Sequence, residues 1–104
     1  MLDKHELVQC LHRIVELNSK QCTQYPPLNV IGQHFVHAAE ELGEMAKCFR
    51  DRNDATLEEE SIDLAICALA VALLENGGDM TSLHDIMSRK LDKWENNLKS
   101  EEEE

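Results

Sequence analysis

Two groups of carboxylates in the sequence have the residue types and spacing to share a hard metal ion. Residues 40–44 are EELGE and residues 60–63 are ESID, so each group contains acids three positions apart. Acids at positions i and i+3 lie one turn apart on the same side of a helix. Carboxylate oxygens suit Mg²⁺ or Mn²⁺. If the two segments form adjacent helices, the expected metal ligands are Glu41, Glu44, Glu60 and Asp63.

The second acidic group runs directly into a long apolar segment. Residues 64–74 are eleven consecutive apolar residues, and a helix that is apolar on every side must be enclosed by other helices. We therefore expect Asp63 to be at least partly buried, and so to be paired, protonated or bound to a metal ion. Pairing with a base is the simplest alternative, but one base hardly neutralises several converging acids. The nearest bases in the sequence are Lys47, Arg50 and Arg52.

A di-iron centre would also use carboxylates that converge inside a helical bundle. Such a centre needs a Glu-x-x-His pair on each of two helices. The comparable arrangement here is His37-x-x-Glu40, which has the reverse order and no second copy. The sequence therefore disfavours iron and favours Mg²⁺, with Mn²⁺ as a possible substitute.

Four helices are expected to position these acids. The helical spacing of apolar residues predicts helices over about residues 3–20, 31–50, 56–76 and 81–99. A pair of prolines, a capping box and a pair of glycines mark the boundaries between them. These boundary residues are Pro26 and Pro27, Thr56 with Glu59, and Gly77 with Gly78.

The apolar faces of these helices predict how the chain packs. The third helix is apolar all round, and a chain of 104 residues has only three other helices to cover it. We therefore expect residues 1–100 to form one all-α, four-helix domain that is completed as a homodimer or homotetramer, with the third helix near the interface. The acidic residues 101–104 are expected to form a disordered tail. The residues expected to face the core from the second helix are Ile31, Phe35, Ala38, Leu42, Met45 and Phe49.

Composition excludes several classes of function. The formal net charge is −11, and such a field repels nucleic-acid backbones. The longest apolar run is too short to cross a bilayer, and the charged N-terminal residues do not resemble a secretion signal. The four cysteines contain no C-x-x-C pair, as in a cytosolic protein with free thiols. These features predict a cytoplasmic protein that binds neither nucleic acid nor membrane.

The two acidic groups together resemble the motif of the MazG-like, all-α nucleoside triphosphate pyrophosphohydrolases. That motif is E-E-x-x-E, a spacer, and E-x-x-D, and here fifteen residues separate its two halves. The resemblance covers roughly residues 5–98. It implies a four-helix MazG-like bundle and Mg²⁺-dependent hydrolysis of a nucleoside triphosphate to the monophosphate and pyrophosphate.

The resemblance also implies roles for individual residues. By analogy, Glu41, Glu44, Glu60 and Asp63 hold Mg²⁺ on the substrate phosphates. Glu40 and Glu41 are the expected catalytic residues, with Glu40 helping to position the attacking water. A family pattern near K-x-x-x-N on the last helix suggests phosphate contacts from that helix. The expected substrate-binding residues are Lys47, Lys90, Lys93, Asn97, His37 and Phe35, with Asn96, Tyr25 and His34 as further candidates.

Other functions remain open at this point. Phosphoribosyl-ATP pyrophosphohydrolase and dimeric dUTPase carry a similar pattern, and nothing in the sequence specifies the base or the sugar. A helical interaction module without catalytic activity is the alternative of a different class. The complete set of four expected ligands argues against a degenerate site.

Overall fold

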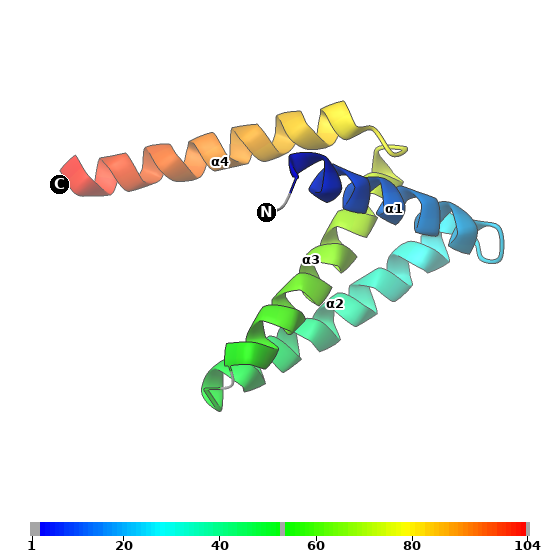
Figure 1. The fold of residues 1–104 in the computed structure, drawn as a ribbon, viewed down its shortest axis with the longest axis horizontal. Helices are drawn as coiled ribbons and strands as arrows, with labels where there is room; N and C mark the ends of the chain where they lie inside the picture. Colours follow the sequence, from blue (N-terminus) through cyan, green and yellow to red (C-terminus); the bar gives the residue numbers. More distant parts are fainter. Residues whose placement is uncertain (1–2, 53, 104) are drawn as a thin grey trace.

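The computed structural model describes residues 3–52 and 54–103. Within these ranges it consists of four helices and no strand, so the expected all-α, four-helix class is confirmed (Figure 1). The helices are α1 (Lys4–Cys22), α2 (Pro27–Arg50), α3 (Asp54–Glu75) and α4 (Met80–Glu103).

The helix boundaries differ from the expected ones in three places. α2 begins at Pro27, several residues before the expected start, with Pro26 as its N-cap. Proline is well tolerated at the first helical position, where its missing N–H has no intrahelical acceptor. α3 begins at Asp54, so Thr56 lies within the helix and is not its N-cap. α4 continues to Glu103, and so includes residues expected to lie in a tail.

α3 is the helix that the other three contact. α2 and α3 run side by side as an antiparallel pair, and α1 crosses them near the C-terminal end of α3 (Figure 1). α4 contacts only α3 among the other helices of the described chain, and it extends away from the rest (Figure 1). The four helices therefore do not form a closed bundle within one chain.

The turn between α3 and α4 sets the direction of the last helix. Gly77 and Gly78 have φ angles of 69° and 78°, a left-handed conformation that glycine adopts at little cost. The amide of Gly78 donates to the carbonyl of Leu73 over 2.8 Å. The Asn76 side chain accepts from the amides of Gly78 and Asp79, each over 3.0 Å. These glycines end α3, as expected from the sequence.

The buried core is small, and a polar side chain stands in it. Val30, Cys48, Ala70 and Leu73 are buried, and so is Asn18, which is only 5% exposed. The Asn18 amide donates to the carbonyl of Ala70 over 3.1 Å, and its oxygen lies 3.3 Å from Nε2 of His34. Asn18 therefore links α1 to both α2 and α3.

The expected core face of α2 was wrong for three of its six residues, whereas Ile31, Ala38 and Met45 are half-buried. Phe35, Leu42 and Phe49 are 62%, 58% and 61% exposed. α2 instead buries Val30 and Cys48, which lie about 120° around the helix from Leu42. The reason is that apolar residues cover more than one side of α2, and α3 covers only one of them.

The third helix is also less enclosed than expected. Ile62 and Ile66 of α3 are exposed, while Ala70 and Leu73 are buried further along. α1 covers only part of α3, so Ile66 lines a cavity beside Ile14 and Leu17 of α1 and is not fully enclosed. None of the helices in the described ranges has an apolar stretch long enough to cross a membrane.

We predict that Asn18→Ala destabilises the protein by about 1–3 kcal/mol, because it removes the buried hydrogen bonds that join three helices. The matched control is Asn96→Ala, which changes an exposed residue of α4 and should have little effect. Urea unfolding followed by circular dichroism measures both. Equal losses of stability in the two variants would contradict a structural role for Asn18.

Candidate metal centre

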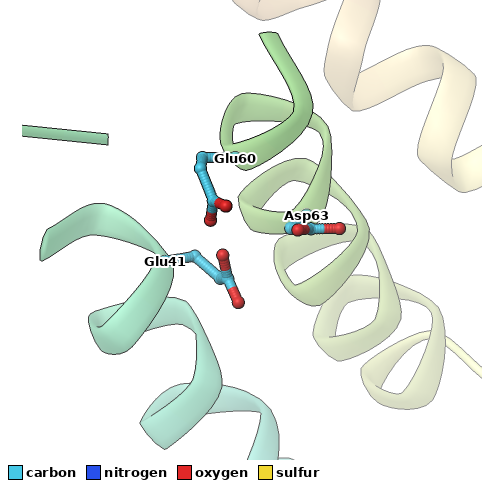
Figure 2. A group of neighbouring side chains, drawn as sticks. All are labelled: Glu41, Glu60 and Asp63. Atoms are coloured by element: carbon cyan, nitrogen blue, oxygen red, sulfur yellow. The ribbon is translucent and has the colours of Figure 1, made fainter. Parts of the chain in front are cut away.

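Three carboxylates from two helices meet at one place in the α2–α3 pair. Glu41 comes from α2, and Glu60 and Asp63 come from α3 (Figure 2). Each residue offers one carboxylate oxygen, and these oxygens all lie within 4.8 Å of one another. Such an arrangement can ligate a divalent cation with hard oxygen donors.

Helix geometry explains why these residues meet. Glu60 and Asp63 are three positions apart and therefore project on one side of α3. Glu41 lies on the side of α2 that also carries the buried residues Val30 and Cys48 and thus faces α3. The antiparallel packing of the two helices then brings the middle of α2 beside the first half of α3 (Figure 1).

Glu41 contains the clearest sign of a missing partner. Its Oε2 atom is covered from solvent and, with both Glu41 and Glu60 ionised, accepts no hydrogen bond. Buried carboxylate oxygens are normally hydrogen-bonded or bound to a cation, because desolvation without compensation is costly. The carboxylate of Glu41 lies beside those of Glu60 and Asp63, where a cation would satisfy it.

The acids also change the pKa of Glu60. A hydrogen bond with the carboxyl group of Glu41 is the largest cause that raises the pKa of Glu60 above its ordinary value of 4.5. Desolvation and repulsion from Glu41 and Asp63 raise this pKa further. Two carboxyl groups can share a hydrogen bond only if one is protonated. A cation between them would remove the need for that proton.

No basic side chain of the described residues forms an ion pair with the three acids. The ion pairs of the described residues involve none of Glu41, Glu60 and Asp63. Arg50 instead pairs with Asp51 over 3.3 Å, and Arg52 lies 5.3 Å from the centre of the Phe49 ring. The alternative in which a lysine or arginine satisfies Asp63 therefore has no support in the geometry.

Two thiols close to the acids are held in the neutral form. Burial is the largest cause that raises the pKa of Cys48, followed by the charges of Glu60 and Glu44. Burial also raises the pKa of Cys67, together with the charges of Glu41 and Asp63. In the metal-free protein these two cysteines therefore stay uncharged and add no further negative charge to the acidic group.

Two of the expected metal ligands, Glu44 and Asp63, do not have the environment that the sequence predicted. Glu44 is exposed and does not join the group of three. Asp63 belongs to the group but is exposed, so the expectation of partial burial was wrong. The apolar run that follows Asp63 is only partly covered by other helices, and its first turns remain open to solvent.

The other expected site residues lie outside the carboxylate group. Glu40 is exposed, with its carboxylate 3.6 Å from Nδ1 of His37. Lys47 and Phe35 are exposed on α2. Three further candidates lie on α4, which makes no contact with α2 in the described chain; they are Lys90, Lys93 and Asn97.

Asn18 was missed in the sequence, although a signal for it was present. It continues the apolar row of α1 that contains Leu11, Ile14 and Val15, at a position where a polar residue is unexpected. A buried polar side chain needs partners from other elements. The position therefore indicated a contact between helices.

Comparisons with known protein families, with curated proteins and with solved structures find no match to this chain.

The raised pKa of Glu60 predicts how pH affects the metal-free protein. The folded state binds this proton more tightly than the unfolded chain does, so the contribution to stability is complete below pH 4.5 and is lost as pH rises through the raised pKa. Glu60→Gln cannot titrate, so its stability in a chelator should depend less on pH over this window. Glu75→Gln, at an exposed position of α3, is the control.

Urea unfolding at several values between about pH 4 and pH 7 measures this difference. If Glu60→Gln and the wild type show the same pH dependence, the carboxyl pair does not have the energetic role described above.

Proposed function

We propose that this protein is a Mg²⁺-dependent nucleoside triphosphate pyrophosphohydrolase. The observation that carries the proposal is the group formed by Glu41, Glu60 and Asp63, in which one covered oxygen lacks a partner. The resemblance of residues 40–44 and 60–63 to the MazG-like motif supplies the reaction class.

The electrostatics of the chain fit this substrate only if a cation takes part. The protein has a formal net charge of −11 and would repel a triphosphate. Mg²⁺ held by the three carboxylates would offset most of the local negative charge, polarise the phosphates and lower the pKa of a bound water. The carboxylates hold and orient the cation, and most of the remaining catalytic work is positioning.

The roles of the remaining acids follow from their positions. Glu41 bridges from α2 to the two acids of α3, so it is both a ligand and the residue that fixes the geometry of the group. Glu44 lies one turn along α2 from Glu41 and would bind the phosphates through a second cation. Glu40 is exposed beside His37, where it can orient an attacking water from the solvent side.

The cellular setting is part of the same proposal. All four cysteines are free thiols, as is usual in the cytoplasm, where Mg²⁺ and nucleotides are abundant. The proposed assembly is a homodimer or homotetramer.

The exposed apolar faces of α2 and α4 favour one competing function, a helical interaction module without catalytic activity. The two functions are separated by assaying pyrophosphate release from a panel of ribonucleoside and deoxyribonucleoside triphosphates and phosphoribosyl-ATP, with and without Mg²⁺. Release from none of them would favour the interaction module.

We predict that Asp63→Asn lowers turnover by about 100-fold or more, because a charged ligand at the reacting phosphate is lost. The fold should remain intact, since Asp63 is exposed and the amide is nearly isosteric. Asp92→Asn, at an exposed position of α4, is the matched control and should keep its activity. A variant that melts far earlier than the wild type but turns over normally per folded molecule would rule out Asp63 as a metal ligand.

We also predict that Mg²⁺ stabilises the folded protein. A cation at 100 times its dissociation constant adds about 2.7 kcal/mol if it binds only the folded state, and it relieves the repulsion among the three acids. Thermal unfolding with and without millimolar Mg²⁺ measures this effect, with Glu41→Gln as the variant that should lose most of it. An unchanged melting temperature in the wild type would argue against a preformed site.

A further inference from the structure

A chain of hydrogen bonds joins α1 to both of the helices that it crosses. The Asn18 amide of α1 donates to the carbonyl of Ala70 in α3 over 3.1 Å, and Oδ1 of Asn18 lies 3.3 Å from Nε2 of His34 in α2. Asn18 and Ala70 are both buried, and His34 is half-buried. The imidazole of His34 is thus the end of this chain that lies closest to solvent.

The directions of these hydrogen bonds determine the tautomer of His34. The Ala70 carbonyl can only accept, so the nitrogen of the Asn18 amide faces it and the oxygen faces the imidazole. That oxygen can also only accept, so Nε2 of His34 must carry the hydrogen. In the neutral ring, Nδ1 then has no hydrogen. His34 therefore completes the chain of hydrogen bonds in its uncharged form.

The surroundings of His34 suit an uncharged ring. It lines a cavity between α1, α2 and α3 to which α3 contributes only the apolar side chains of Ile66 and Ala70. α1 contributes one charged group to this cavity, the cation of Lys20. On α2, His37 lies one turn from His34, and its charge repels a charge on His34.

No acid among the described residues lines this cavity. Asp63 of α3 lies one turn before Ile66, but it belongs to the carboxylate group shared with α2 (Figure 2). Glu40 of α2 is exposed and lies 3.6 Å from Nδ1 of His37. α4 contacts neither α1 nor α2 in the described chain. A charged His34 would therefore have cations nearby and no counter-ion in the cavity.

The pKa of His34 agrees with this geometry. Burial is the largest cause that lowers the pKa of His34 below its ordinary value of 6.5, followed by the charge of His37. The folded state then binds this proton less tightly than the unfolded chain does. The resulting loss of stability is absent above pH 6.5, grows as pH falls below 6.5 and is complete below the lowered pKa.

A proton on Nδ1 changes what His34 needs from its surroundings. Nε2 can still donate to Asn18, but Nδ1 becomes a second donor, and the charged ring gains from contact with water. The hydrogen bond to Asn18 is long at 3.3 Å and holds the ring weakly. An outward movement of the ring would hydrate it, but would leave the buried oxygen of Asn18 without its donor.

We propose that the chain of hydrogen bonds from His34 through Asn18 to Ala70 is a pH-sensitive contact, which holds α1 on the α2–α3 pair while His34 is neutral and weakens when His34 gains a proton. Loosening of α1 opens the two cavities that Leu17 of α1 and Ile66 of α3 line together. The carboxylate group stays assembled, because its members come from α2 and α3. The pH-sensitive contact does not depend on the proposed function.

The first test measures the tautomer and the titration of His34 directly. Long-range proton–nitrogen NMR spectra should show the hydrogen of the neutral ring on Nε2. The same resonances should titrate below the ordinary pKa of 6.5, and their loss in His34→Gln assigns them. A neutral ring with its hydrogen on Nδ1, or a titration above pH 6.5, would overturn the proposal.

The second test asks whether α1 loosens in acid. Amide hydrogen exchange, corrected for the intrinsic effect of pH on exchange, compares the protection of α1 with that of the α2–α3 pair at about pH 7.5 and about pH 5.5. In the wild type, α1 should lose protection in acid relative to the pair.

Two histidine variants identify the group responsible for this loss. His34→Gln keeps an N–H donor near the position of Nε2 but cannot titrate, so its α1 should stay protected at both pH values. His84→Gln, at an exposed position of α4, is the matched control and should lose protection as the wild type does. An equal loss in His34→Gln and in the wild type would assign the effect to another group and overturn the proposal.

The third test reverses the sign of the pH effect. Asn18→Asp supplies a counter-ion for a charged His34 but no donor for the Ala70 carbonyl. Urea unfolding should therefore find this variant less stable than the wild type at about pH 7.5, with the difference shrinking as pH falls to about 5.5. Asn96→Asp adds the same charge at an exposed position of α4 and should show no such recovery. A difference for Asn18→Asp that stays constant or grows in acid would exclude His34 as the pH-sensitive group.

Discussion

The packing of α2 against α3 is the contact on which the other features of this structure depend. It buries Val30 and Cys48, turns Glu41 towards α3 and so assembles the three carboxylates. The same contact places like charges next to one another without a base to neutralise them. The apolar packing of the two helices therefore holds together carboxylates that repel one another, and a bound cation would relieve this repulsion.

The core around this contact is too small to enclose the chain. Among the residues whose burial is described, four apolar residues and Asn18 are buried, whereas apolar side chains of α2 and α4 remain exposed. A domain of this size has little core in any case, and directing one of its four helices outward reduces it further. The apolar side chains left exposed on α2 and α4 follow directly from this arrangement.

All three carboxylates come from the α2–α3 pair of one chain. A cation held between them would take the place of a base, and it would not have to compete with a permanent ion pair among the described residues.

The sequence by itself determined the four helices and the two acidic groups, because apolar spacing, turn residues and i, i+3 acids are local properties. Only the tertiary structure decided that Glu41, Glu60 and Asp63 meet while Glu44 stays outside, since this depends on how α2 is rotated against α3. It also decided that Phe35, Leu42 and Phe49 are exposed. Periodicity showed that these residues share one face of α2. However, α2 has apolar residues on more than one side, and periodicity does not show which side packs against α3. In the structure it is the side that carries Val30, Glu41 and Cys48.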